Sequence, residues 1–198
     1  MDHIELFNKM IEYYEGNPKR IQHFTKVFEY CRLIGTMENI PEKEQFALET
    51  TALVHDIGIK KAEEVHGKGN CSGKLQEKLG PEIAEKMLNE LGYPKDVIER
   101  VSYLVAHHHT YNDICDSDYQ ILVEADFLVN MYEDGLPSQN VKAAYEAVFK
   151  TESGKRICRC LELNNFNSCI ICKVPIKKGT LSVRMYVNKV FHISVGLN

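Results

Sequence analysis

The sequence lacks the features that mark several large classes of proteins. No stretch approaches the roughly 18 consecutive apolar residues of a membrane-spanning helix, so an integral membrane protein is not expected. Residues 1–5 have neither the basic flank nor the apolar core of a secretory signal, and we therefore expect a cytoplasmic protein. Basic residues are not in excess either. The formal net charge is −4 and the lysines and arginines are scattered, which argues against binding a nucleic-acid polymer but leaves room for a small phosphorylated partner in a locally positive pocket.

Helical spacing of apolar residues dominates most of the chain. The 198 residues, 44% of them hydrophobic, suffice for one main core. Apolar stripes bounded by proline and glycine predict helices over residues 3–15, 18–37, 41–58, 80–92, 97–109, 121–132, 138–150 and 152–163. Residues 60–74 are rich in lysine and glycine and are predicted to form a loop, and the Gly80-Pro81 pair is predicted to begin a helix. We therefore expect an all-α domain of six to eight helices over residues 1–164.

The remaining tail, residues 165–198, breaks this pattern. Residues 180–195 alternate between apolar and polar around Asn188-Lys189, which predicts a β-hairpin. A lone two-stranded hairpin is only marginally stable, so it must dock on the helical body or stay loose. Four cysteines near this boundary suggest an alternative function as a zinc-binding interaction module: Cys158, Cys160, Cys169 and Cys172. Against it, the first two lie in a helical pattern, where residues two apart point in different directions.

Ionisable side chains on apolar helix faces mark the candidate functional site. His55 and Asp56 end an apolar segment, where burying two such side chains is costly unless a partner such as a metal ion compensates them. Four further positions also fall on faces that should be buried: His23, Asp126, His107 and His108. Each has an ordinary explanation, for instance a hydrogen-bonded core histidine or a histidine at a helix C-terminus. Their recurrence on successive helices predicts one shared site.

The ordered set resembles the H…HD…D signature of the HD-domain phosphohydrolase superfamily. Residues 53–58 are similar to the HDIG form of the doublet, residues 80–84 and 92–108 resemble the segments that follow it, and residues 124–126 resemble the segment with the final aspartate. The resemblance covers about residues 18–150. It implies an all-helical HD-domain bundle that holds one divalent metal and allows a second. The implied metal ligands are His23, His55, Asp56 and Asp126.

Two departures from the family pattern bear on the metal count and the substrate. In two-metal members, further histidines come from a region where Gln76 or Glu77 stands here, and from the later paired histidines, which His107 and His108 match. Glu77 is therefore either a second-metal ligand or general base, or a surface glutamate. Position 59 is isoleucine, whereas the HDxxE nucleotidases have glutamate there. In this respect the sequence resembles family members that act on phosphate esters or nucleotide polyphosphates.

The resemblance implies a mechanism. Mixed imidazole and carboxylate ligands suit Mn²⁺, Fe²⁺, Co²⁺, Ni²⁺ or Zn²⁺ better than Mg²⁺ or Ca²⁺. Such a metal would activate a water molecule and polarise a phosphoryl oxygen, with Asp56 orienting the water. His107 or His108 would donate a proton to the leaving group. The cations best placed to bind substrate phosphates are Arg20, Lys60 and Lys61, although the lysines also suit a solvated loop.

The sequence thus predicts a metal-dependent phosphohydrolase that cleaves a P–O bond in a small phosphorylated metabolite, preferably a nucleotide. One alternative is a non-catalytic HD-like sensor that binds a metal and a nucleotide without turnover. The zinc-binding module in the cysteine-rich tail is the other. The oligomeric state is open, with a homodimer among the arrangements allowed.

Overall fold

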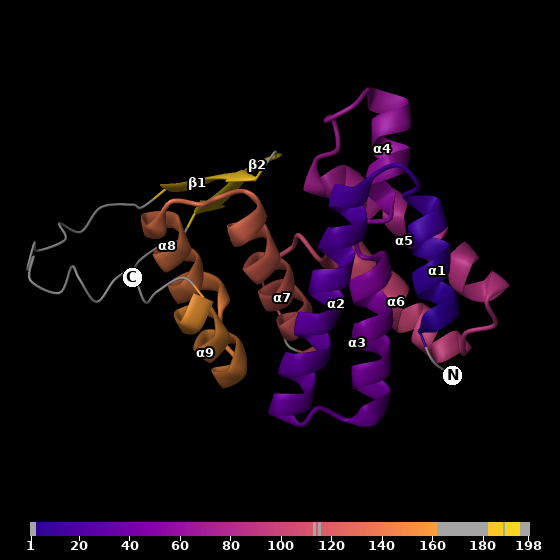
Figure 1. Ribbon diagram of the computed structural model, residues 1–198, viewed down its shortest axis with the longest axis horizontal. Coiled ribbons are helices and arrows are strands. Elements are labelled where there is room, and N and C mark those ends of the chain that lie inside the picture. Colours follow the sequence, from indigo (N-terminus) through magenta and orange to yellow (C-terminus); the bar gives the residue numbers. More distant parts are fainter. Residues whose placement is uncertain (1–2, 113, 115, 162–181, 188, 195–198) are drawn as a thin grey trace, which may run out of the picture.

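The structure, a computed structural model, describes residues 3–112, 114, 116–161, 182–187 and 189–194, the last two stretches as backbone. These residues form nine helices and a two-stranded antiparallel sheet (Figure 1). The helices are α1 (Ile4–Tyr13), α2 (Pro18–Glu38), α3 (Glu42–Val54), α4 (Gly58–His66), α5 (Gly73–Glu90), α6 (Lys95–His107), α7 (Ser117–Glu133), α8 (Ser138–Val148) and α9 (Glu152–Leu161). The predicted all-α bundle is confirmed.

Helix α2 shows how local sequence sets the boundaries. Pro18 occupies its first turn, where a missing backbone N–H costs nothing, and the Asn17 side chain accepts a hydrogen bond from the N–H of Arg20. At the other end Asn39 adopts a left-handed conformation, φ 55°, and its N–H bonds to carbonyls of the last turn. These signals flank the apolar stripe, so the predicted range of 18–37 and the observed helix agree closely.

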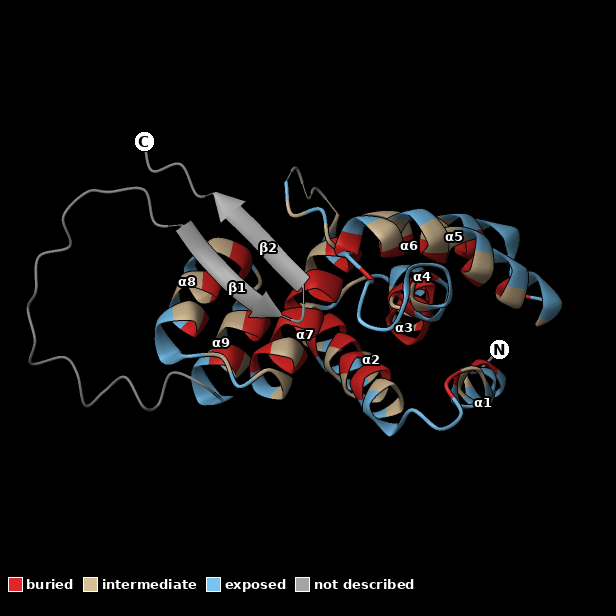
Figure 2. Cartoon of the chain, turned by 90° about the horizontal axis from the view of Figure 1, so that it is seen from above, coloured by how far each residue is buried: buried red, intermediate tan, exposed pale blue. Residues whose placement is uncertain are grey.

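Two apolar cores meet along α2 and α3. One core joins α2 and α3 to α7, α8 and α9, and the other joins them to α1, α5 and α6. Helix α7 is buried along most of its length (Figure 2), so polar side chains on it are also withdrawn from solvent. Buried His23 lies on α2 and buried His55 directly follows α3, the two helices that both cores share.

Two expectations from the sequence about residues 58–90 are wrong. Residues 60–74 are not all loop, because α4 spans Gly58–His66. Its apolar face, including Ile59 and Ala62, packs in a small separate core with Cys71, which a composition rich in lysine conceals. The next helix does not begin at Gly80-Pro81. Helix α5 begins at Gly73, with the Ser72 side chain accepting a hydrogen bond from the N–H of Leu75, and Pro81 lies inside the helix.

In the tail, β1 (Ser182–Val187) pairs antiparallel with β2 (Lys189–Ser194), which confirms the predicted hairpin. Strand β1 runs beside α8 (Figure 1). Cys158 is buried and Cys160 exposed on α9, so the two side chains point apart as predicted. Cys169, Cys172 and the 164/165 boundary lie outside the described residues. Among the residues that the structure describes, no helix combines the length and apolar character needed to cross a bilayer.

Candidate metal centre

The His55-Asp56 doublet lies in the break between α3 and α4. Helix α3 ends at Val54 and α4 begins at Gly58, so the residues between them form a tight turn. The turn's carbonyl groups are bonded to the end of α1: the Tyr14 hydroxyl donates to the carbonyl of Asp56 (2.8 Å), and the Tyr13 hydroxyl donates to the carbonyl of Ile57 (3.1 Å). Because buried backbone carbonyls need partners, these two tyrosines fix the turn that carries the doublet.

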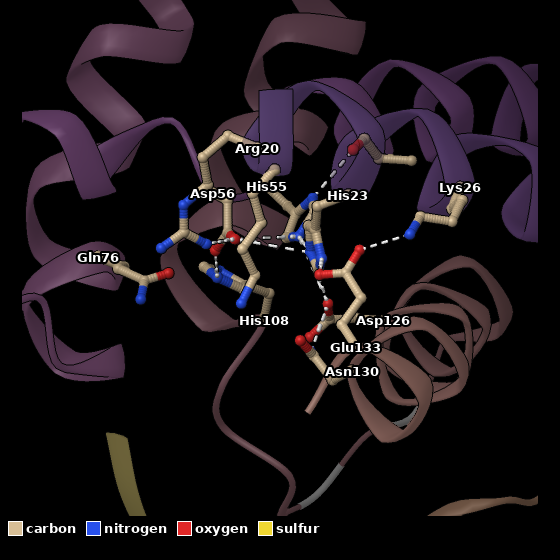
Figure 3. Close-up of polar contacts among 12 residues, drawn as sticks. Arg20, His23, Lys26, His55, Asp56, Gln76, His108, Asp126, Asn130 and Glu133 are labelled. Atoms are coloured by element: carbon tan, nitrogen blue, oxygen red, sulfur yellow. Dashed lines mark hydrogen bonds and ion pairs between the residues drawn. The ribbon is translucent and has the colours of Figure 1, made fainter. Parts of the chain in front are cut away.

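The structure brings together all four residues that were predicted as metal ligands (Figure 3). His23 Nε2 lies 3.3 Å from His55 Nε2 and 3.2 Å from Asp126 Oδ1. Asp56 Oδ2 lies 3.7 Å from His23 Nε2 and 3.8 Å from His55 Nε2. Metal–ligand bonds of about 2.1 Å place neighbouring donor atoms roughly 3.0–3.4 Å apart. The first group, which consists of His23, His55, Asp56 and Asp126, is therefore close to the spacing of a coordination shell.

Hydrogen bonds outside the group determine which ring nitrogens face inward. The Nδ1 atoms of His55 and His108 lie 2.9 and 2.8 Å from the backbone carbonyl oxygen three residues earlier. Since a carbonyl only accepts, each Nδ1 carries the proton and each Nε2 keeps its lone pair when the ring is neutral. His23 Nδ1 likewise lies 3.2 Å from the Glu133 carboxylate. Neutral His23 and His55 therefore present two lone pairs to each other, an arrangement that needs a proton or a metal ion between them.

The pKa shifts of the grouped residues also indicate a site for a cation. Burial lowers the pKa of His23, but its contacts with Asp126 and Glu133 outweigh burial and raise that pKa to about 10. Burial also lowers the pKa of His55, and the charges of Asp56 and Asp126 again raise it overall. Burial raises the pKa values of Asp56 and Asp126, yet the neighbouring histidines bring both well below their ordinary range. The group thus stabilises added positive charge in its interior, as a cation site must.

A second group of donor atoms shares Asp56. The ligand atoms of Asp56, His108 and His109 lie within 4.8 Å of one another. Asp56 Oδ1 is 3.6 Å from His108 Nε2, while its Oδ2 faces the first group. His108 Nε2 is buried and has no hydrogen-bond partner in the described part of the chain. Gln76 Oε1 lies 3.1 Å from His109 Nε2, so this amide oxygen is beside the second group and accepts a hydrogen bond from the His109 ring.

Two residues predicted to be catalytic lie apart from both groups. His107 Nδ1 is 2.7 Å from the Tyr103 carbonyl oxygen, and its ring lies tilted against the half-exposed ring of Tyr103, with centroids 4.4 Å apart on the outer side of α6. Glu77 Oε1 accepts hydrogen bonds from the N–H of His109 (3.0 Å) and the hydroxyl of Thr110 (2.9 Å). Glu77 therefore holds the turn that presents His109 and is not one of the grouped donors.

Of the three predicted phosphate-binding cations, Arg20 is the one that the structure places at the centre. Its Nη1 lies 3.4 Å from Asp56 Oδ2, and a quarter of the side chain is exposed. Lys60 is exposed and donates to the Tyr13 carbonyl at 2.9 Å, with its ammonium over the ring of the same residue. Lys61 is exposed and pairs with Glu64 on its own helix at 3.5 Å.

Sequence reasoning missed His109 and Glu133. His109 lies just beyond the end of α6, where helical periodicity no longer says which way a side chain points. Glu133 did carry a signal, because it lies seven residues after Asp126 and therefore on the same face of α7. Its role still depends on which helix packs against that face.

Comparison with known families agrees with this geometry. A family model described as HD domain matches residues 20–131, more than half of the chain and a span that contains both groups of donor atoms. HD domains are typical of metal-dependent hydrolases. The comparisons with curated proteins and with solved structures gave no match. The chain belongs to the HD domain family.

Proposed function

We propose that this protein is a metal-dependent phosphohydrolase that cleaves a P–O bond in a small phosphorylated metabolite, preferably a nucleotide. One observation carries the proposal. Three buried histidines, His23, His55 and His108, each have Nδ1 held by an outer acceptor and Nε2 turned toward the carboxylate of Asp56. Histidines with a fixed outer hydrogen bond and an inward lone pair are the usual ligands of catalytic transition metals.

The donor set fits Mn²⁺, Fe²⁺, Co²⁺, Ni²⁺ or Zn²⁺, because two imidazoles and two carboxylates make up the first group. When bound, such an ion lowers the pKa of a water molecule and polarises a phosphoryl oxygen. Asp56 has one oxygen toward each group, so its carboxylate would contribute a ligand atom to either group. The second group, with Gln76 in place of a further histidine, is the weaker of the two by its chemistry, since an amide oxygen is a poorer ligand for these metals than an imidazole.

Other residues are assigned from their position at the centre. Arg20 presents a planar guanidinium beside Asp56 and is partly exposed, which suits it to bind the phosphate of a substrate. His108 is better assigned as a metal ligand than as a proton donor, because its Nδ1 is held by a carbonyl and its Nε2 faces Asp56. His107 is not assigned as the proton donor, because its ring lies against Tyr103 on the outer side of α6. Glu77 is assigned to support the turn at His109.

The test combines metal content with turnover. Chelator-treated protein is reloaded in turn with Mn²⁺, Co²⁺, Ni²⁺, Zn²⁺ and Mg²⁺ and given a panel of nucleotides, and phosphate release is measured with and without added pyrophosphatase. We expect release that requires a transition metal. His55→Ala and Asp56→Ala should lose metal and activity while keeping their helical circular dichroism.

His66→Ala is the matched control, because this histidine is exposed at the end of α4 and belongs to neither group. Full activity in His55→Ala or in Asp56→Ala would refute the proposal. Tight metal and nucleotide binding without turnover of any substrate would favour the non-catalytic sensor instead.

A further inference from the structure

Polar side chains on α2 and α7 face one another at the first group (Figure 3). Asp126 and Glu133 are two helical turns apart on one face of α7 and both contact His23 on α2. Glu133 uses its two oxygens differently: Oε2 lies 3.2 Å from His23 Nδ1, and Oε1 lies 2.7 Å from the ammonium of Lys26. One carboxylate thus connects a candidate ligand to a cation at the edge of the site.

The position of Glu133 is unfavourable for a carboxylate as far as the stability of the helix is concerned. It is the last residue of α7, at the negative end of the helix dipole, and only 9% of its side chain is exposed. Withdrawing a carboxylate from water at such a position costs free energy unless its partners compensate. Lys26, with 37% of its side chain exposed, compensates the charge but does not explain why the second oxygen faces His23.

His23 also differs from the two other inward-facing histidines. His55 and His108 donate to neutral backbone carbonyls, whereas His23 faces a carboxylate. A charged acceptor holds the ring more strongly and increases the electron density on the opposite nitrogen, which improves it as a metal ligand.

We propose that Glu133 is a positioning residue of the metal centre. Its carboxylate fixes the His23 ring with Nε2 toward the first group and strengthens that nitrogen as a ligand, while Lys26 holds the carboxylate in place. The inference rests on the proposed metal centre. It predicts that Glu133 controls how tightly metal is held, while Glu133 itself contacts the outer nitrogen of His23 and belongs to neither group of donor atoms.

The experiment measures Co²⁺ and Zn²⁺ affinity of the full chain by competition with a chromophoric chelator, together with the visible absorption of the Co²⁺ form. Glu133→Ala should weaken binding roughly 10- to 100-fold and change the Co²⁺ spectrum. Glu133→Gln keeps an acceptor oxygen without the charge, so it should retain the spectrum of the unchanged protein and lose less affinity. Lys26→Met removes the ion pair but leaves the contact with His23, and should weaken binding less than about threefold.

Equal affinity in Glu133→Ala and the unchanged protein would overturn the inference, and so would equal losses in Glu133→Ala and Lys26→Met, which would indicate an ordinary ion pair. If Glu133→Ala does not fold, Glu133→Gln is compared with Lys26→Met instead. Equal losses of metal affinity in these two variants would then overturn the inference. Absence of metal binding by the unchanged protein would instead refute the metal centre itself.

Discussion

Replacing Gly58 by alanine would test how the turn at the doublet is held against α5. A Cβ atom at this position would lie 2.8 Å from the Gln76 carbonyl oxygen, 2.9 Å from the backbone nitrogen of Gly80 and 3.1 Å from its Cα. All three obstacles are backbone atoms, which cannot rotate away as a side chain can. Gly80 is itself closely packed, because a Cβ atom added there would lie 2.7 Å from Cγ1 of Val105 on α6. The two helices would have to separate by about half an ångström to restore ordinary contact.

The size of the effect follows from two opposing contributions. Forcing an extra methyl group into a packed interior costs about 1–3 kcal/mol. Alanine gains up to about 1 kcal/mol over glycine inside a helix, but Gly58 is the first residue of α4, where this gain is smaller. We therefore expect a net loss of roughly 1–2 kcal/mol in the free energy of unfolding. For a chain of this size that corresponds to a melting temperature lower by roughly 2–8 °C.

The assay is urea or thermal unfolding followed by circular dichroism, on metal-free protein. Gly35→Ala is the matched control. Gly35 lies within α2, and the atoms nearest to an added Cβ belong to the side chains of Gln45 and Ile40. The Gln45 amide can move at the cost of its hydrogen bond to Glu49, and the higher helix propensity of alanine offsets this cost. Gly35→Ala should therefore be near neutral. If Gly58→Ala were as stable as the unchanged protein, or no less stable than Gly35→Ala, the close approach of α4 and α5 would not be a constraint on this fold.

Two further outcomes are expected. Gln76→His should raise the metal affinity of the second group, because it replaces an amide oxygen 3.1 Å from His109 Nε2 with an imidazole. After loading with excess metal and removal of unbound ions, metal analysis should then approach two ions per chain. An unchanged stoichiometry would contradict a second ion at this group. Glu124→Ala should lower the free energy of unfolding, measured in urea, by roughly 2–4 kcal/mol. The fully buried carboxylate accepts hydrogen bonds from the backbone N–H groups of Lys150 and Thr151, which would lose their partner. A change below about 0.5 kcal/mol would contradict that assignment.

The inner part of the site could be predicted from the sequence because burial on a helix has a period. His23 and Asp126 each interrupt an apolar stripe, and that interruption is visible without knowing which helices pack together. The resemblance then joined them to the doublet, and the structure brings these side chains within hydrogen-bonding distance or little more of one another. Helix boundaries were predicted well where proline, glycine or asparagine signals flank the stripe, as at α2.

The remainder depends on pairing between elements, which periodicity does not encode. Helix α4 was missed because its few apolar residues face a small local core and its lysines dominate the composition. The place of Gln76 in the sequence does not show that it approaches His109, because this contact follows from the packing of α5 against α6. Lys60 and Lys61 seemed suited to a phosphate by proximity to the doublet, yet they lie along a helix that carries them to other partners.

The doublet lies at the change from α3 to α4, where His55 and Ile57 keep helical backbone angles. Neighbouring residues in a regular helix point about 100° apart, so the geometry of this turn sets how His55 and Asp56 face the site. Here the chain leaves α3 after Val54, and backbone bonds of three-residue span on either side tighten the turn. His55 then points into the first group while Asp56 lies between the two groups, with one carboxylate oxygen toward each. Among the described residues, Asp56 is the side chain that the two donor groups share, so the turn at 55–57 positions both of them at once.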